Sequence, residues 1–172
     1  MNIFCLDSDP FLAAQFQCDK HVVKMVLESA QMLCSAHRLL ESSTVQENFY
    51  KITHQKHPCT IWTMETSGNY QWHYQHFVGL CDEYRYRYDK THLSDQKLRE
   101  SLSIMPDNIL KADLTPFPLA LPDEYKTTCP IESYREYYKS KSALFNMNWT
   151  RREVPDWFEF RNRNSEKQKA QN

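Results

Sequence analysis

The pattern of apolar and polar positions predicts helices along most of the chain, and the first of them is the longest. Asp9 and Pro10 mark a helix start, because an aspartate can cap free backbone N–H groups and proline fits the first helical position. A helical pattern follows over residues 11–40. Within it, Asp19 can cap a second segment, which would break the helix near Cys18.

Further helices are predicted after a polar, loop-like stretch at 41–57. Three of them begin with proline, whose missing N–H is harmless at a helix start, and Ser94 can cap another. The predicted helices cover residues 58–66, 70–89, 94–103, 130–145 and 155–160. Residues 1–8 form a short extended segment, and residues 105–130 contain five prolines, which predict an extended connection.

No stretch alternates apolar and polar residues as a half-buried strand does. We therefore expect an all-α fold with about five to six helices and a proline-rich extended connection. A length of 172 residues suits one domain with a sizeable core. This single helical domain is expected to span residues 1–163, with a disordered polar tail at 164–172.

Composition narrows the possible functions. The chain has only two glycines, Gly68 and Gly79, so it lacks a glycine-rich phosphate loop and we expect no nucleotide cofactor. No apolar stretch approaches the roughly 20 residues that span a membrane, and the first residues do not resemble a secretory signal. Six widely spaced cysteines without a Cys-x-x-Cys pair are typical of reduced thiols. We therefore expect a cytoplasmic protein with no membrane partner.

The first predicted helix carries a stripe of polar side chains, because successive residues turn by about 100° around a helix. The stripe consists of Gln17, His21, Lys24, Glu28, Gln31 and Ser35. If it lines a cleft, the imidazole of His21, the ammonium group of Lys24 and the carboxylate of Glu28 can reach one substrate. If it faces water, Lys24 and Glu28 form an ordinary surface pair. The spacing alone leaves both interpretations open.

A second polar cluster precedes the predicted helix at Pro58 and contains His54, Lys56, His57 and Cys59. No further cluster supplies the spacing of a four-ligand zinc site, so we expect no bound metal. The free amides at the helix start, beside the two histidines and the lysine, can instead hold an anion such as a phosphate. An inert polar loop is an equal alternative.

Aromatic and basic residues alternate in three places, at residues 84–88, 134–141 and 148–152. Stacking rings beside cations are typical of surfaces that bind nucleic-acid bases and phosphates. The net charge of −1 argues against a protein that simply coats nucleic acid, but residues 126–172 carry ten Lys or Arg against six Asp or Glu. The candidate nucleic-acid contacts are Lys20, His54, His57, Arg85, Arg87, Arg135, Lys139, Lys141, Arg151 and Arg152.

The order of these elements distantly resembles the pyrimidine-dimer DNA glycosylase/AP lyases of the phage endonuclease V-like family. The pieces that carry the resemblance are residues 1–4, 14–28, 57–58, 84–88 and 134–141. In that family a very short N-terminal segment precedes a helix with a basic–acidic pair, followed by a histidine- or proline-containing loop and a long helix that ends in aromatic and basic residues. The resemblance covers about residues 1–145 in element order, without a long identical block.

The resemblance implies a DNA-binding base-excision enzyme that acts on damaged or modified pyrimidines without a cofactor. The α-amine would attack the sugar C1′ and form an imine, and a carboxylate would stabilise the cationic intermediates and assist strand cleavage. An α-amine suits this role because such amines have an ordinary pKa of about 8. Methionine before so large a residue as Asn2 is usually retained, so Met1 would supply the amine. The family's basic–acidic pair falls near Lys20 and His21, and the nearest carboxylate on that face is Glu28.

On this interpretation Met1, Glu28, His21 and Lys24 are the catalytic candidates and DNA is the partner. Two other interpretations stay open at this level. The chain can be a helical domain that binds nucleic acid or protein without catalysis. It can also be a metal-dependent hydrolase-like protein that uses several histidines with a carboxylate, although His73 and His76 are more typical of packed residues on an aromatic helix. The histidines concerned are His54, His57, His73 and His76.

Overall fold

The computed structural model describes residues 1–160, in which all regular structure is helical and no strand occurs. The α-helices are α1 (Pro10–Gln15), α2 (Asp19–Leu39), α3 (Pro58–Glu65), α4 (Ser67–Tyr88), α5 (Leu93–Leu98) and α6 (Pro130–Ser140). Three short 3-10 turns complete the list, namely η1 (Ser101–Ser103), η2 (Asp123–Tyr125) and η3 (Lys141–Ala143). The expected all-α class is therefore confirmed. Within residues 1–160 no helix combines the length and apolar character needed to cross a membrane.

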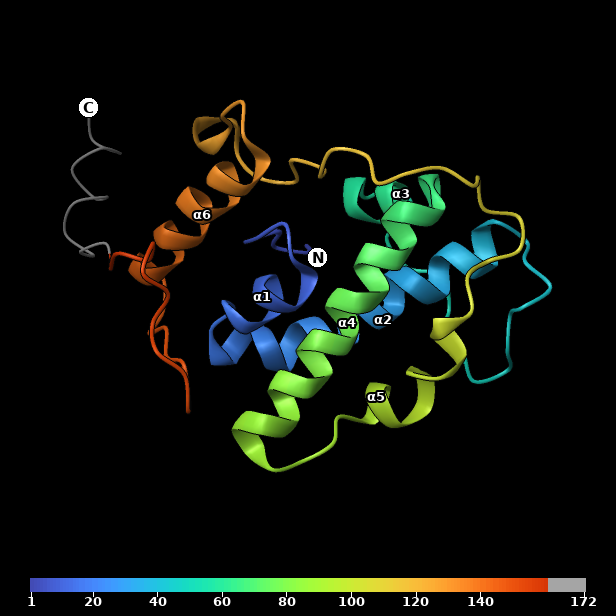
Figure 1. Ribbon diagram of the computed structural model, residues 1–172, viewed down its shortest axis with the longest axis horizontal. Coiled ribbons are helices and arrows are strands. Elements are labelled where there is room, and N and C mark those ends of the chain that lie inside the picture. The colour runs from blue at the N-terminus through green and yellow to red at the C-terminus, as the bar shows by residue number, and fades with distance from the viewer. Residues whose placement is uncertain (161–172) are drawn as a thin grey trace.

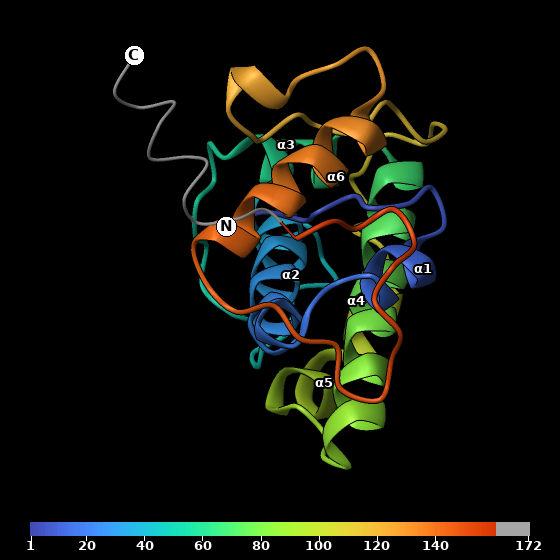
Figure 2. The same ribbon diagram turned by 90° about the vertical axis from the view of Figure 1, so that its left-hand side faces the viewer.

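The two long helices, α2 and α4, form the centre of the fold, with α1 packed on α4 and α3 packed on both (Figure 1). The N-terminal segment lies between this pair and α6, as both ribbon views show (Figures 1 and 2). Ile3, Cys5 and Leu6 in this segment are completely buried. The first residues of the chain are therefore part of the core, and α6 encloses them.

The starts of the first two helices follow local chemistry in different ways. Asp9 accepts hydrogen bonds from the backbone N–H groups of Phe11 and Leu12, which confirms the predicted cap. The break before the second helix is also confirmed, but Asp19 is not its cap. Cys18 occupies the cap position without a side-chain bond, and Asp19 is the first helical residue. The Asp19 carboxylate instead accepts hydrogen bonds from Thr150, so a tertiary contact uses the group that the sequence assigned to a cap.

The predicted proline-rich connection is confirmed as an extended segment that runs along α3 and the start of α4. Ser67 and Gly68 donate backbone hydrogen bonds to the carbonyls of Leu110 and Ala112. A Cβ atom at position 68 would lie 2.4 Å from the backbone nitrogen of Leu114, so glycine is required for this close approach. The contact explains one of the only two glycines in the chain.

Several predicted boundaries need correction. The helix expected at 94–103 ends early and is followed by η1, and its cap is His92, whose Nδ1 accepts a hydrogen bond from Ser94 N. Residues 130–145 divide into α6 and η3. No helix forms at 155–160, where one turn closes as Phe158 N donates to Pro155 O. The expected tail at 164–172 lies outside the described residues.

The reason for the missing last helix lies in its aromatic rings. Trp157 packs edge-on against Phe16 of the α1–α2 connection, whereas the adjacent Phe158 packs against Trp149. Tyr138 of α6 contacts both rings. These tertiary contacts determine the path of a segment that is too short to form a stable helix alone.

Candidate functional site

The polar stripe of α2 faces the N-terminal segment and forms one wall of a cavity of about 200 Å³, which we name the Met1 cleft. It is lined by Met1, Asn2, Phe4, His21, Lys24, Met25, Glu28, Tyr137 and Lys141. The side chains come from the N-terminal segment, α2, α6 and the start of η3. All four catalytic candidates of the sequence analysis therefore lie in one cavity.

The α-amine of Met1 lies 3.6 Å from Oε2 of Glu28. The Met1 side chain is only 2% exposed and that of Glu28 13%, so the pair is largely shielded from water. The other oxygen of the same carboxylate, Oε1, lies 3.2 Å from the ammonium nitrogen of Lys24. One carboxylate thus faces two cations, one at the chain terminus and one from the next turn of the helix.

Asn2 shapes the turn that aims the amine at Glu28. Its Oδ1 accepts hydrogen bonds from the backbone N–H groups of Ile3 and Phe4, and its Nδ2 donates to the carbonyl of Ala120. Phe4 has a φ of 58°, a left-handed conformation that is unfavourable for an aromatic residue. A backbone held in such a conformation beside a cavity is a frequent property of functional sites.

His21 forms the aromatic wall of the cleft together with Phe4, with ring centroids 4.7 Å apart. Its Nδ1 lies 2.7 Å from the hydroxyl oxygen of Tyr138, which also accepts a hydrogen bond from the backbone of Cys18. The Tyr138 proton is therefore available for Nδ1, and this favours the tautomer with hydrogen on Nε2. Burial, with nearby Lys141, Lys24 and Lys20, lowers the pKa of His21 to about 3. The imidazole is neutral at physiological pH.

Lysine side chains surround the cleft, and two of them lie over aromatic rings. Lys141 Nζ is 4.0 Å from the ring centroid of Tyr137, and Lys20 Nζ is 4.4 Å from that of Phe145. The Lys24 side chain is 60% exposed. Among the described residues that line the cavity, Lys24 and Lys141 are the cations and Glu28 is the only carboxylate. Of the predicted nucleic-acid contacts, Lys141 lines this site, and Lys20 lies close enough to lower the pKa of His21.

The loop before α3 borders the same region. His57 caps α3, with its Nδ1 accepting a hydrogen bond from Cys59 N, so one of the amides expected to hold an anion is already occupied. Burial and then the positive charge of the Met1 amine lower the pKa of His57, and Glu28 opposes this effect. His54 is exposed and bonds through Nδ1 to its neighbour Thr53. Of the two predicted contacts, His57 is thus within electrostatic reach of the cleft.

Arg87, predicted as a phosphate contact, is instead a buried structural residue. Its side chain is fully enclosed and forms ion pairs with Glu83 and Asp19. It also donates hydrogen bonds to the backbone carbonyls of Gln15 and Gln17. The guanidinium group joins α4 to the α1–α2 connection, because five donors in a planar fork can satisfy several acceptors at once. The prediction for this residue is corrected.

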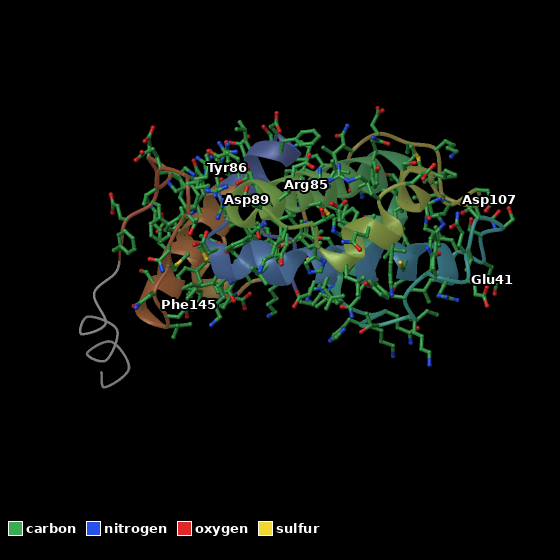
Figure 3. All side chains as sticks on the ribbon, turned by 90° about the horizontal axis from the view of Figure 1, so that it is seen from below. Glu41, Arg85, Tyr86, Asp89, Asp107 and Phe145 are labelled. Atoms are coloured by element: carbon green, nitrogen blue, oxygen red, sulfur yellow. The ribbon has the colours of Figure 1, made fainter. Side chains whose placement is uncertain are left out.

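The other arginines and the lysine predicted as nucleic-acid contacts outside the cleft also have acidic partners. Arg85 pairs with Asp95 at 2.9 Å, Arg151 with Asp89 at 2.6 Å, Arg152 with Glu83 at 2.6 Å, Arg135 with Asp7 at 3.1 Å and Lys139 with Glu136 at 2.7 Å. Figure 3 shows Arg85, Tyr86 and Asp89 grouped near one end of α4, with Phe145 apart from them. These pairs neutralise much of the positive charge from which the sequence predicted a nucleic-acid surface.

The histidines of the metal interpretation do not form one ligand set. His73 and His76 are completely buried, the first bonded to Thr63 and the second to Gln17. Burial lowers the pKa of His76 to about 3. His54, by contrast, lies exposed on its loop. In the part of the chain that the structure describes, no group of three or more His, Cys, Asp or Glu is placed to hold a metal.

Sequence reasoning missed the residues that complete the cleft from other elements. Phe4 and Tyr137 supply its aromatic wall, Tyr138 bonds to His21, and Asn2 turns the chain. The signal that could have found them is the concentration of tyrosines in α6, of which Tyr134 and Tyr138 are fully buried. Comparison with known protein families, curated proteins and solved structures gives no match to this chain.

Proposed function

We propose that this protein is a DNA base-excision enzyme, a glycosylase with AP-lyase activity that acts on damaged or modified pyrimidines. The observation that supports the proposal is the 3.6 Å approach of the Met1 α-amine to Glu28 inside a cavity surrounded by lysines. An amine nucleophile beside a carboxylate, shielded from water, suits reactions that pass through a cation at a sugar carbon. The distant family resemblance supports the same chemistry.

In the first step the Met1 ammonium group loses a proton to solvent, and the lone pair of the resulting amine forms a bond to C1′ of the deoxyribose. The bond from C1′ to the base breaks, and its electron pair leaves with the base, which then takes up a proton. The positive charge that develops on the sugar lies beside the Glu28 carboxylate, which stabilises it electrostatically. Lys24 holds the other carboxylate oxygen and fixes its orientation.

In the second step the amine nitrogen loses a proton, its lone pair expels the ring oxygen as the C1′–O4′ bond breaks, and O4′ takes up a proton, which leaves a protonated imine between Met1 and C1′. Removal of a proton from C2′ lets the C3′–O bond break, so that the phosphate leaves by β-elimination. Glu28 is the base nearest to the amine. The Nε2–H of neutral His21 can donate a hydrogen bond to a sugar or phosphate oxygen.

A nucleic-acid substrate is supported by the surroundings of the cleft. Lys20, Lys24 and Lys141 offer positive charge for phosphates on either side of the reacting sugar. The rings of Phe4 and Tyr137, with centroids 6.4 Å apart, line the cleft and give it an aromatic wall against which a base outside the stack can pack. The whole chain has a net charge of only −1, so we expect binding to depend on this local group of cations and not on the overall charge.

The deciding experiment is borohydride trapping, which reduces an imine to a stable protein–DNA adduct. Full-length protein is incubated with DNA that carries one abasic site, and the adduct is located by mass spectrometry after digestion. We expect it on the α-nitrogen of Met1. A variant with two residues added before Met1 should lose the adduct and still bind DNA, because the nucleophile is displaced.

The outcomes separate the alternatives. An adduct on a lysine, or normal trapping by the extended variant, would remove Met1 from the mechanism. Salt-dependent DNA binding without any adduct would favour the non-catalytic interpretation. A matched substitution, Glu47→Gln on the exposed loop away from the cleft, should leave trapping unchanged.

A further inference from the structure

Leu144 is the most exposed of the large hydrophobic side chains in residues 1–160, at 72%. It directly follows η3, whose first residue, Lys141, lines the Met1 cleft. The next residue, Phe145, packs edge-on against the His21 ring at 5.6 Å, and His21 also lines the cleft. The exposed side chain of Leu144 therefore lies between two residues of the sequence, Lys141 and Phe145, of which the first lines the cleft and the second packs on a residue that lines it.

Residues 141–145, which we name the Leu144 tip, are fixed by backbone hydrogen bonds and ring contacts. The backbone N–H groups of Leu144 and Phe145 both donate to the carbonyl of Lys141, at 2.9 and 3.2 Å. The Phe145 ring lies under the ammonium group of Lys20 as well as against His21. These contacts fix the backbone on which the exposed Leu144 side chain projects into water.

The neighbouring surface of α2 has the same mixed character. Lys20, Val23, Lys24 and Leu27 share its outward face, because they are spaced by three or four residues. Val23 and Leu27 are exposed, and Glu28, on the adjoining side of the helix, turns its carboxylate to the Met1 amine in the cleft. This face of α2, whose Lys20 lies over the Phe145 ring, thus combines apolar side chains with cations.

We propose that Leu144 is a wedge that enters the base stack of duplex DNA at the nucleotide whose sugar reaches Met1. This inference rests on the proposed function and deepens it, because it specifies duplex DNA as the substrate. A base inside a duplex cannot reach a cavity of about 200 Å³ unless its nucleotide leaves the stack. An inserted apolar side chain stabilises the opened step, while flanking lysines hold the phosphates.

The observations favour DNA over a membrane or a protein partner. Lys141 begins the turn that precedes Leu144 and lines the cleft, and the ammonium group of Lys20 lies over the ring of Phe145, so two cations lie close to this leucine and can hold a backbone phosphate when a sugar reaches the amine. A single projecting leucine inserts between two base pairs, whereas a protein interface normally buries a broad apolar patch.

The test compares Leu144→Ala with a matched control, Leu110→Ala, whose side chain is 65% exposed on the proline-rich connection. Borohydride trapping is measured on one abasic oligonucleotide, both single-stranded and annealed to its complement. Since a wedge matters only in a stack, we expect Leu144→Ala to lose about tenfold in trapping rate on the duplex and less than about twofold on the single strand. Leu144→Met should restore the duplex rate, and Leu110→Ala should resemble the unchanged protein.

A second measurement does not depend on catalysis. The duplex carries tetrahydrofuran, a stable abasic analogue, with 2-aminopurine as the adjacent base, whose fluorescence rises when it unstacks. The unchanged protein and Leu110→Ala should raise the fluorescence, and Leu144→Ala should not. The wedge would be overturned if Leu144→Ala raised the fluorescence as much as the unchanged protein does. It would also be overturned if Leu144→Ala lost the same factor in trapping rate on the single strand as on the duplex.

Failure of the proposed function gives a different result. If no adduct forms on either substrate but the fluorescence rise still requires Leu144, the wedge is supported and the proposed lyase activity is contradicted. Binding to phosphatidylserine vesicles tests the alternative that Leu144 contacts a membrane surface. Binding to these vesicles that requires Leu144, without binding to the duplex, would contradict the wedge and assign the tip to a membrane surface.

Discussion

Two regions of this molecule carry aromatic and basic side chains in close proximity, and they differ in how the charge is balanced. At the C-terminal end of α4, Arg85 and Arg87 lie with Arg151 and Arg152, and each arginine has a carboxylate partner. Around the Met1 cleft, Lys20 and Lys141 lie over rings instead, and no ion pair within residues 1–160 is formed by either ammonium group.

The difference teaches that aromatic–basic alternation does not by itself identify a binding surface. The arginines at the end of α4 connect helices and loops, because a guanidinium fork can satisfy several carboxylates and carbonyls. Lys20 and Lys141 form no such pair with a carboxylate among the described residues, so their charge is available to an outside partner. Four predictions test this contrast.

The largest expected effect comes from Arg87→Ala. Removal of this enclosed side chain leaves the carboxylates of Glu83 and Asp19 without a central partner. We expect the free energy of unfolding to fall by about 3–5 kcal/mol, as for other broken buried pairs. Urea unfolding measures this loss. Arg151→Ala, at an exposed pair, should leave the free energy nearly unchanged. Equal effects would contradict the structural role of Arg87.

Glu28→Gln tests the opposite region. The amide keeps the shape of the side chain but loses the negative charge beside the Met1 amine. We expect the rate of adduct formation to fall by about 100-fold, equivalent to about 2.7 kcal/mol in the barrier, with DNA affinity retained. Single-turnover trapping gives the rate. A rate within twofold of the unchanged protein would show that the carboxylate takes no part.

His21 gives the cleft its own contribution to the pH dependence of stability. Its pKa is about 3 in the folded protein, against an ordinary value of about 6.5. Below pH 6.5 the unfolded chain binds a proton at His21 that the folded chain excludes. The contribution of His21 to the free energy of unfolding is therefore fully present above pH 6.5 and decreases as the pH falls toward 3. His21→Gln should reduce the slope of unfolding free energy against pH by up to about 1.4 kcal/mol per unit. Urea unfolding between pH 6.5 and 4.5 measures it.

The smallest effect concerns salt. Each phosphate contact that releases counterions contributes about 0.9 to the slope of log affinity against log salt on duplex DNA. We expect Lys20→Ala with Lys141→Ala to lower this slope by about 1.8. Arg85→Ala with Arg151→Ala should leave it unchanged, because those charges are already paired. A result in the reverse order would move the DNA surface to the end of α4.

Local sequence was sufficient for the helical class, the Asp9 cap, the proline helix starts at 58 and 130, and the extended connection at 105–130. Each depends on interactions within a few residues, namely helical periodicity, a capping carboxylate or the fixed φ of proline. The stripe that contains His21, Lys24 and Glu28 was also predictable, since a helix places residues three, four and seven apart on one face.

Long-range packing decided the rest. Whether that stripe faced water or a cleft depended on the N-terminal segment and α6, which are distant from it in the chain but enclose it in the fold. The same dependence buried Arg87, whose partner Asp19 is 68 positions away, and prevented a helix at 155–160. A side chain's partners across the core determine its burial and charge, and periodicity within one helix carries no information about them.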